Sequence, residues 1–115
     1  MKAHEQAIAL ARALDEKLAQ DIRVYDVSKR SNLTDYEIVA TGISTPHLKA
    51  LVVDLQKRLK ARGIVGAPSC GAPESGWVVL DVFDVIVHIF TREMRDYYQI
   101  EELWDGAPLV PFEES

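Results

Sequence analysis

The 115-residue sequence has a single cysteine, Cys70, which excludes an internal disulfide and gives no cysteine pair with zinc-finger spacing. A lone cysteine fits the reducing conditions of the cytoplasm. The chain also has no apolar run long enough to cross a bilayer, and its first residues, MKAHEQ, lack the apolar core of a signal peptide. These absences predict a cytoplasmic protein without a membrane partner.

Basic residues are fewer than acidic ones: the chain has 13 Lys and Arg and 18 Asp and Glu, which gives a formal net charge of -5. Residues 101–115 contain five acids and no Lys or Arg. The main basic cluster, Lys57, Arg58, Lys60 and Arg62, lies at the end of an expected helix, where cations also suit the negative end of the helix dipole. A contact between this cluster and nucleic acid is the less favoured alternative, since phosphate-backbone binding needs a basic groove. The charge balance favours a basic protein partner and no sequence-specific binding to nucleic acid.

Hydrophobic periodicity and turn residues predict the element order α-β-β-α-β-β-α. The expected elements are a helix over 3–19, strands over 21–28 and 36–41, a helix from Ser44–Pro46 to near Gly63, two strands within 77–90, and a short helix or two over 91–104. Residues 66–76 have the composition of a loop, and residues 109–115 are expected to form an acidic tail after a single domain of residues 1–108. The expected fold class is α/β or α+β, with a mixed β-sheet flanked by helices.

The stretch DVFDVIVHIF (81–90) places two carboxylates and a histidine, Asp81, Asp84 and His88, in an otherwise apolar run. Such residues could form a metal site, an acid–base pair or a contact surface. They could also form a hairpin with a hydrogen-bonded core histidine.

A two-residue turn at 82–83 would place Asp81 opposite Asp84 and Trp77 opposite His88. Because side chains alternate along strands, these polar and aromatic groups would share one face, and the other face would be entirely aliphatic. The first face is either a recognition patch or is covered by a helix. The residue pattern leaves both possibilities equally open.

Three motifs resemble the ribosomal silencing factor family, also called Iojap-like. They are TDYEIVATGISTPH (34–47), WVVLDVFDVIVHIF (77–90) and RDYYQIEELW (95–104). This chain departs from the family pattern at Phe83, where a glycine is usual, and at Glu37, where an aromatic or aliphatic residue is usual. A third departure is Cys70-Gly71, where a Glu-Gly pair is common.

The resemblance implies a nucleotidyltransferase-like fold without transferase activity or a cofactor. It also implies that the protein binds the large ribosomal subunit through the subunit's protein fourteen. Occupying that surface would block subunit joining when nutrients are short, and the protein would also act in large-subunit biogenesis. A bacterial, cytoplasmic member that forms a homodimer when free is expected.

The alternative function is that of a metal-dependent nucleotidyltransferase, whose phosphate-binding turn is imitated by residues 42–44. However, Asp81 and Asp84 are three residues apart across a turn rather than two apart on one strand, and no third carboxylate is evident. We therefore expect no catalytic, cofactor-binding or metal-binding residues. The residues expected to bind the ribosomal protein are Trp77, Asp81, Asp84, His88, Arg95, Tyr98, Glu101 and Trp104.

Overall fold

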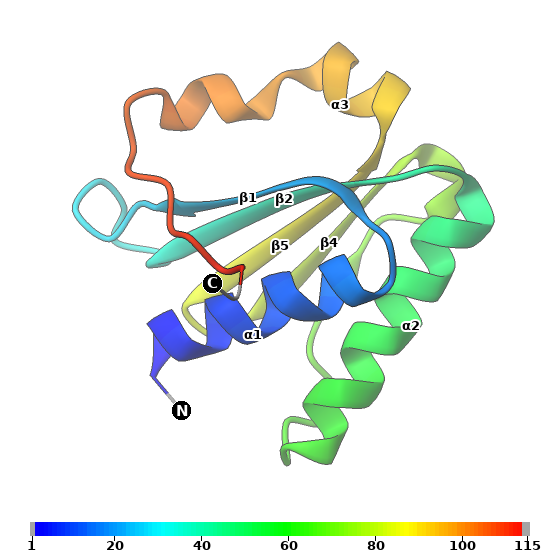
Figure 1. Ribbon diagram of the computed structural model, residues 1–115, viewed down its shortest axis with the longest axis horizontal. Helices are drawn as coiled ribbons and strands as arrows, with labels where there is room; N and C mark the ends of the chain where they lie inside the picture. The colour runs from blue at the N-terminus through cyan, green and yellow to red at the C-terminus, as the bar shows by residue number, and fades with distance from the viewer. Residues whose placement is uncertain (1, 114–115) are drawn as a thin grey trace.

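The structure is a computed structural model that describes residues 2–113. It has three layers: a five-stranded mixed sheet, the helices α1 and α2 on one face, and α3 with a 3-10 helix, η2, on the other (Figure 1). Within residues 2–113, no helix is both long and apolar enough to cross a membrane. The expected mixed sheet flanked by helices is confirmed.

Every expected helix and strand is present, with small shifts at the ends. The elements are α1 (Ala3–Glu16), β1 (Gln20–Asp26), β2 (Tyr36–Gly42), α2 (Thr45–Ala61), β3 (Ser69–Cys70), η1 (Pro73–Ser75), β4 (Trp77–Val82), β5 (Val85–Thr91), α3 (Arg92–Tyr98) and η2 (Ile100–Trp104). The expected loop over 66–76 contains two short additions, β3 and the 3-10 helix η1. Ser44 caps α2, because its hydroxyl accepts a hydrogen bond from the His47 backbone N–H, and Pro46 lies in the first turn.

The strands follow the order β1-β2-β5-β4-β3. Among the strand pairs within residues 2–113, only β2 and β5 are parallel, with Tyr36 opposite Val85 and Gly42 opposite Thr91. Because α2 follows β2 and α3 follows β5, the two helices begin at the same end of the sheet. They cover opposite faces of it (Figure 1).

The main core lies between the sheet and the pair α1 and α2. The helices contribute leucines at helical spacing, and the hairpin contributes its aliphatic face. Each of these side chains is at most 2% exposed: Leu10, Leu14, Leu48, Leu51, Leu55, Leu59, Val78, Leu80, Val82, Val85, Val87 and Ile89. Burying a side chain of this size contributes roughly 1.5–3 kcal/mol, so this layer supplies much of the driving force for folding.

The β4–β5 hairpin confirms the expected sorting of faces but not the expected pairing. The turn residues are Phe83 and Asp84, so the register is Trp77–Phe90, Val79–His88, Asp81–Ile86 and Val82–Val85. The predictions that Asp81 faces Asp84 and that Trp77 faces His88 are therefore wrong. Moving the turn by one residue shifts each partner by two positions, which preserves the face of every side chain.

The hairpin turn holds Phe83 in the left-handed region, with φ 58°, and leaves its ring 75% exposed. A side chain in this conformation costs about 1 kcal/mol, which glycine avoids. We expect Phe83→Gly to raise the free energy of unfolding by up to about 1 kcal/mol, measured by chemical denaturation. Phe83→Ala is the matched control, since it removes the ring but keeps the strained Cβ. An equal gain in both variants would contradict the conformational explanation.

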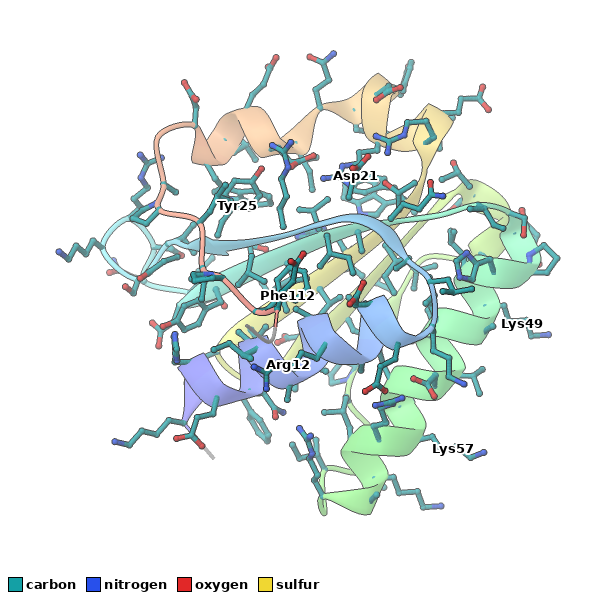
Figure 2. All side chains as sticks on the ribbon, viewed as in Figure 1. Arg12, Asp21, Tyr25, Lys49, Lys57 and Phe112 are labelled. Atoms are coloured by element: carbon teal, nitrogen blue, oxygen red, sulfur yellow. The ribbon has the colours of Figure 1, made fainter. Side chains whose placement is uncertain are left out.

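The C-terminal segment packs on β1 as far as it is described. The backbone N–H of Val110 donates to the Val24 carbonyl at 2.8 Å. Arg12 Nε donates to the Phe112 carbonyl at 2.7 Å, which ties the segment to α1 (Figure 2). The described part of the expected acidic tail is therefore integrated into the domain, and residues 114–115 lie outside the described residues.

Candidate partner-binding face

The second face of the sheet lies beneath α3 and η2. Thr91 caps α3 by accepting a hydrogen bond from the Met94 backbone N–H at 3.3 Å. Gln99, with φ 48°, ends α3 in the left-handed region, and η2 follows at once. A second hydrophobic cluster lies between these helices and the sheet, with Tyr25, Val27, Val39 and Phe90 buried and Trp77, Met94, Ile100, Trp104 and Ala107 packed against them.

An aromatic cluster spans this face, and its members include Trp77, His88, Phe90, Tyr98 and Trp104. The ring centroid of Trp77 lies 5.0 Å from that of Phe90, in a stacked arrangement, and 4.8 Å from that of Tyr98. Trp104 packs on His88 with centroids 5.6 Å apart. Phe90 is buried, whereas Tyr98 is 47% exposed and Trp104 partly exposed. The cluster therefore joins the sheet to a solvent-facing aromatic edge.

His88 is buried at the centre of the cluster with both ring nitrogens engaged. Trp77 Nε1 donates to His88 Nδ1 at 3.3 Å, so the ring proton resides on Nε2, which lies 2.8 Å from Glu37 Oε1. Glu37 is also buried, and this contact joins β2 to β5. His88 therefore matches the expectation of a satisfied core histidine, while Trp77, which it orients, remains partly exposed.

Arg95 connects α3, η2 and the sheet. Arg95 is only 6% exposed. Its guanidinium donates to both carboxylate oxygens of Glu101, at 2.7 and 3.1 Å. It also donates to the Thr41 hydroxyl at 2.8 Å and to the Asp21 carbonyl at 2.7 Å. The Tyr25 hydroxyl donates to the same Glu101 carboxylate. Arg95 thus fixes the position of the covering helices and has little surface left for a partner.

The contacts of Glu101 set its charge. Burial alone would raise the pKa of the carboxyl, but hydrogen bonds from Arg95 and Tyr25 outweigh it and hold the pKa below its usual value. Burial and the hydrogen bond to Glu101 raise the pKa of the Tyr25 phenol. At neutral pH the site therefore contains a carboxylate, a guanidinium and a neutral phenol.

A groove lies between β1, α3, η2 and the segment that follows η2. Its walls carry both charges: Arg23, Arg92 and Arg95, with Asp21, Asp96, Glu101, Glu102 and Asp105. Arg92 pairs with Asp21, and Arg95 with Glu101, so two of the three cations are already neutralised by carboxylates. Such a groove is poorly suited to hold a phosphate group.

Asp81 and Asp84 lie at the far end of the hairpin, both exposed. Asp81 pairs with Ile86 across the hairpin, and the backbone carbonyl of Asp84 accepts from the Thr34 hydroxyl at 2.6 Å and the Tyr36 N–H at 3.1 Å. In the described part of the chain, no group of three His, Cys, Asp or Glu residues could hold a metal ion. Of the eight expected site residues, the structure gathers six around α3 and η2 and leaves these two at the hairpin tip.

The solvent side of α3 and η2 also carries residues that are not among the eight expected to bind the partner. Tyr97 is 74% and Leu103 73% exposed, and Asp96 and Glu102, which precede them in the sequence, are exposed as well. We call these four residues and Tyr98 the outer face. The acids and aromatic residues within 95–104 indicate that a surface of this kind is present. Which of their side chains point toward solvent depends on where α3 ends and η2 begins. The sequence also gives no sign that Glu37, a departure from the family pattern, is the hydrogen-bond partner of His88.

Comparison with known proteins finds a matching family model, similar sequences and a similar solved structure. The family model "Ribosomal silencing factor during starvation" matches residues 1–115. The chain is 42% identical to "Ribosomal silencing factor RsfS" of Chromobacterium violaceum over 94 residues, covering 82% of this chain and 77% of that protein. It is 33% identical over 98 residues to the mouse "Mitochondrial assembly of ribosomal large subunit protein 1", covering 83% of this chain and 43% of that protein. A crystal structure of a Chromobacterium violaceum protein has a TM-score of 0.86 and 36% identity, covering 100% of this chain and 95% of that one.

Proposed function

This chain belongs to the family of ribosomal silencing factors, and from that membership we propose that it binds protein fourteen of the large ribosomal subunit and thereby blocks subunit joining. The family assignment itself makes it a ribosome-associated silencing factor. The name of the mouse relative, which refers to large-subunit assembly, supports the choice of subunit.

The observation that carries this proposal is the outer face of α3 and η2. Large exposed aromatic and aliphatic side chains lie there beside acids: Tyr97, Tyr98 and Leu103 with Asp96 and Glu102. Aromatic side chains supply much of the affinity in protein interfaces, and complementary charge speeds and orients the encounter. An acidic and aromatic surface therefore suits a basic protein such as a ribosomal one.

The buried residues of the site hold this surface in place. Arg95 and Glu101 fix α3 against η2, and His88 orients the indole of Trp77. In this proposal Trp77, Tyr98 and Trp104 contact the partner through their exposed edges, while Arg95, His88 and Glu101 act as positioning residues. Inhibition is steric and needs no turnover, since a protein on the joining surface excludes the other subunit.

We expect the protein to sediment with purified large subunits, not with small ones, and to reduce their joining. Sucrose-gradient sedimentation at increasing protein concentration measures both effects. Migration with small subunits, or unchanged joining at saturation, would reject the proposal.

The acids at the hairpin tip provide a charge test within the same assay. Asp81→Asn with Asp84→Asn should weaken large-subunit binding about fivefold if these acids meet basic groups of the partner. Glu5→Gln with Asp15→Asn removes the same charge from exposed positions on α1 and should bind as the wild type does. A magnesium- and nucleotide-dependent transferase activity that the first double variant loses would instead support the nucleotidyltransferase alternative.

A further inference from the structure

The solvent side of α2 carries a stripe of three lysines, Lys49, Lys57 and Lys60. All three are exposed, and their spacing of eight and three residues places them along one side of the helix. Figure 2 shows Lys49 and Lys57 pointing away from the sheet. Within residues 2–113 none of the three forms an ion pair. We call this group the lysine stripe.

The fold does not use the lysine stripe, although it uses other cations nearby. Arg58 pairs with Glu16 at 2.7 Å and with Asp54 at 2.8 Å, so it joins α2 to α1. The helix dipole favours cations in the last turn of α2, but Lys49 is in the second turn, where it gains nothing from the dipole. Residues 45–66 contain five cations and one acid, on a chain whose net charge is -5. The molecule is therefore bipolar, with a basic α2 and an acidic outer face.

The helices that carry the two charged surfaces, α2 and α3, both begin at one end of the sheet. Gly42 and Thr91 are register partners at the ends of parallel strands, and α2 and α3 start just beyond them on opposite faces (Figure 1). Lys49, near the start of α2, is the member of the stripe nearest that end. A large body that contacts the outer face can therefore continue around this end of the sheet onto α2.

We propose that the lysine stripe contacts the phosphate backbone of ribosomal RNA beside the protein bound by the outer face. This inference rests on the proposed function, because it requires docking on the ribosome. From Lys49 to Lys60 the helix rises roughly 16 Å, enough to face several phosphates of a double helix. Lysine is a flexible point charge suited to phosphate, and α2 has no Phe, Tyr or Trp on which a base could stack. The contact is thus electrostatic and independent of base sequence.

The test replaces all three lysines by glutamine and measures affinity for salt-washed large subunits from 50 to 300 mM KCl. Each lost phosphate contact should lower the slope of log affinity against log salt by about 0.9, so the slope should fall by about 2 to 3. Affinity near 150 mM salt should fall at least roughly tenfold on the same basis. The matched control, with three arginines in place of the lysines, should keep both affinity and slope.

Binding to the isolated ribosomal protein fourteen separates the possible outcomes. The glutamine variant should bind that protein as tightly as the wild type, because its outer face is unchanged. An equal loss on the isolated protein would show that α2 contacts protein rather than RNA and would overturn this inference. The inference would also be overturned if the glutamine variant, with the thermal midpoint of the wild type, kept the wild-type slope of log affinity for large subunits against log salt. Failure of the wild type to bind large subunits would instead overturn the proposed function.

Discussion

Replacing Trp77 with alanine is expected to lower the free energy of unfolding by about 3 kcal/mol, the lower end of the range for a core aromatic. The indole stacks on Phe90, packs against Tyr98 and donates a hydrogen bond to His88. Its removal leaves a cavity between the sheet and α3, and the ring nitrogen of His88 loses its donor. The lower end applies because Trp77 is partly exposed. Urea denaturation, followed by circular dichroism, measures the change.

Trp77→Phe is the control for packing, because it keeps a ring between Phe90 and Tyr98 but removes the N–H. It should cost about 1 kcal/mol, the net value of a neutral hydrogen bond. Large-subunit affinity, measured at concentrations where each variant is folded, separates stability from recognition. If Trp77→Ala kept the stability of the wild type but lost affinity, the indole would be a contact residue alone, and packing under α3 would not be its role.

Arg95→Met is expected to lower the free energy of unfolding by about 3–5 kcal/mol, the usual cost of breaking a buried ion pair by removing one partner. Methionine keeps much of the side chain's length but leaves the half-buried Glu101 carboxylate without its cation. The Thr41 hydroxyl and the Asp21 carbonyl also lose their hydrogen-bond donor. Because Arg95 joins three elements, α3 and η2 should be the first to open, which hydrogen exchange of their amides would show.

The pH dependence of this loss tests its electrostatic origin. The pKa of Glu101 is below its usual value in the folded protein, so its ionised form contributes stability at neutral pH. That contribution decreases as the pH falls through the folded pKa, so the difference between wild type and Arg95→Met should shrink in acid. Glu101→Gln is the matched partner variant, and combining it with Arg95→Met should cost less than the sum of the two single changes. A difference that is constant from pH 7 to pH 3 would contradict the ion-pair explanation.

The sequence alone determined the order of the helices and strands, and it also determined which face of the β4–β5 hairpin is aliphatic. Helical and strand periods differ, so the spacing of apolar residues identifies each element without knowledge of its neighbours. A cap at Ser44 or Thr45 was also predictable, because a helix cap depends on residues close in sequence, and the structure selects Ser44. The aliphatic face of 77–90 was predictable for a further reason, since only the parity of the turn decides which side chains share a face.

The tertiary structure decided the rest. The pattern of 81–90 permits turns at 82–83 and at 83–84 with the same faces, and the tertiary structure holds Phe83 in a conformation that favours glycine. The partners of His88 and Arg95 come from other elements, Glu37 on β2 and Glu101 on η2. Such pairs are invisible in a single sequence because hydrogen bonding depends on proximity after folding, and residues 51 positions apart, as Glu37 and His88 are, carry no periodic signal of contact. Which polar side chains are buried and which are exposed was likewise fixed only when α3 and η2 packed over the sheet.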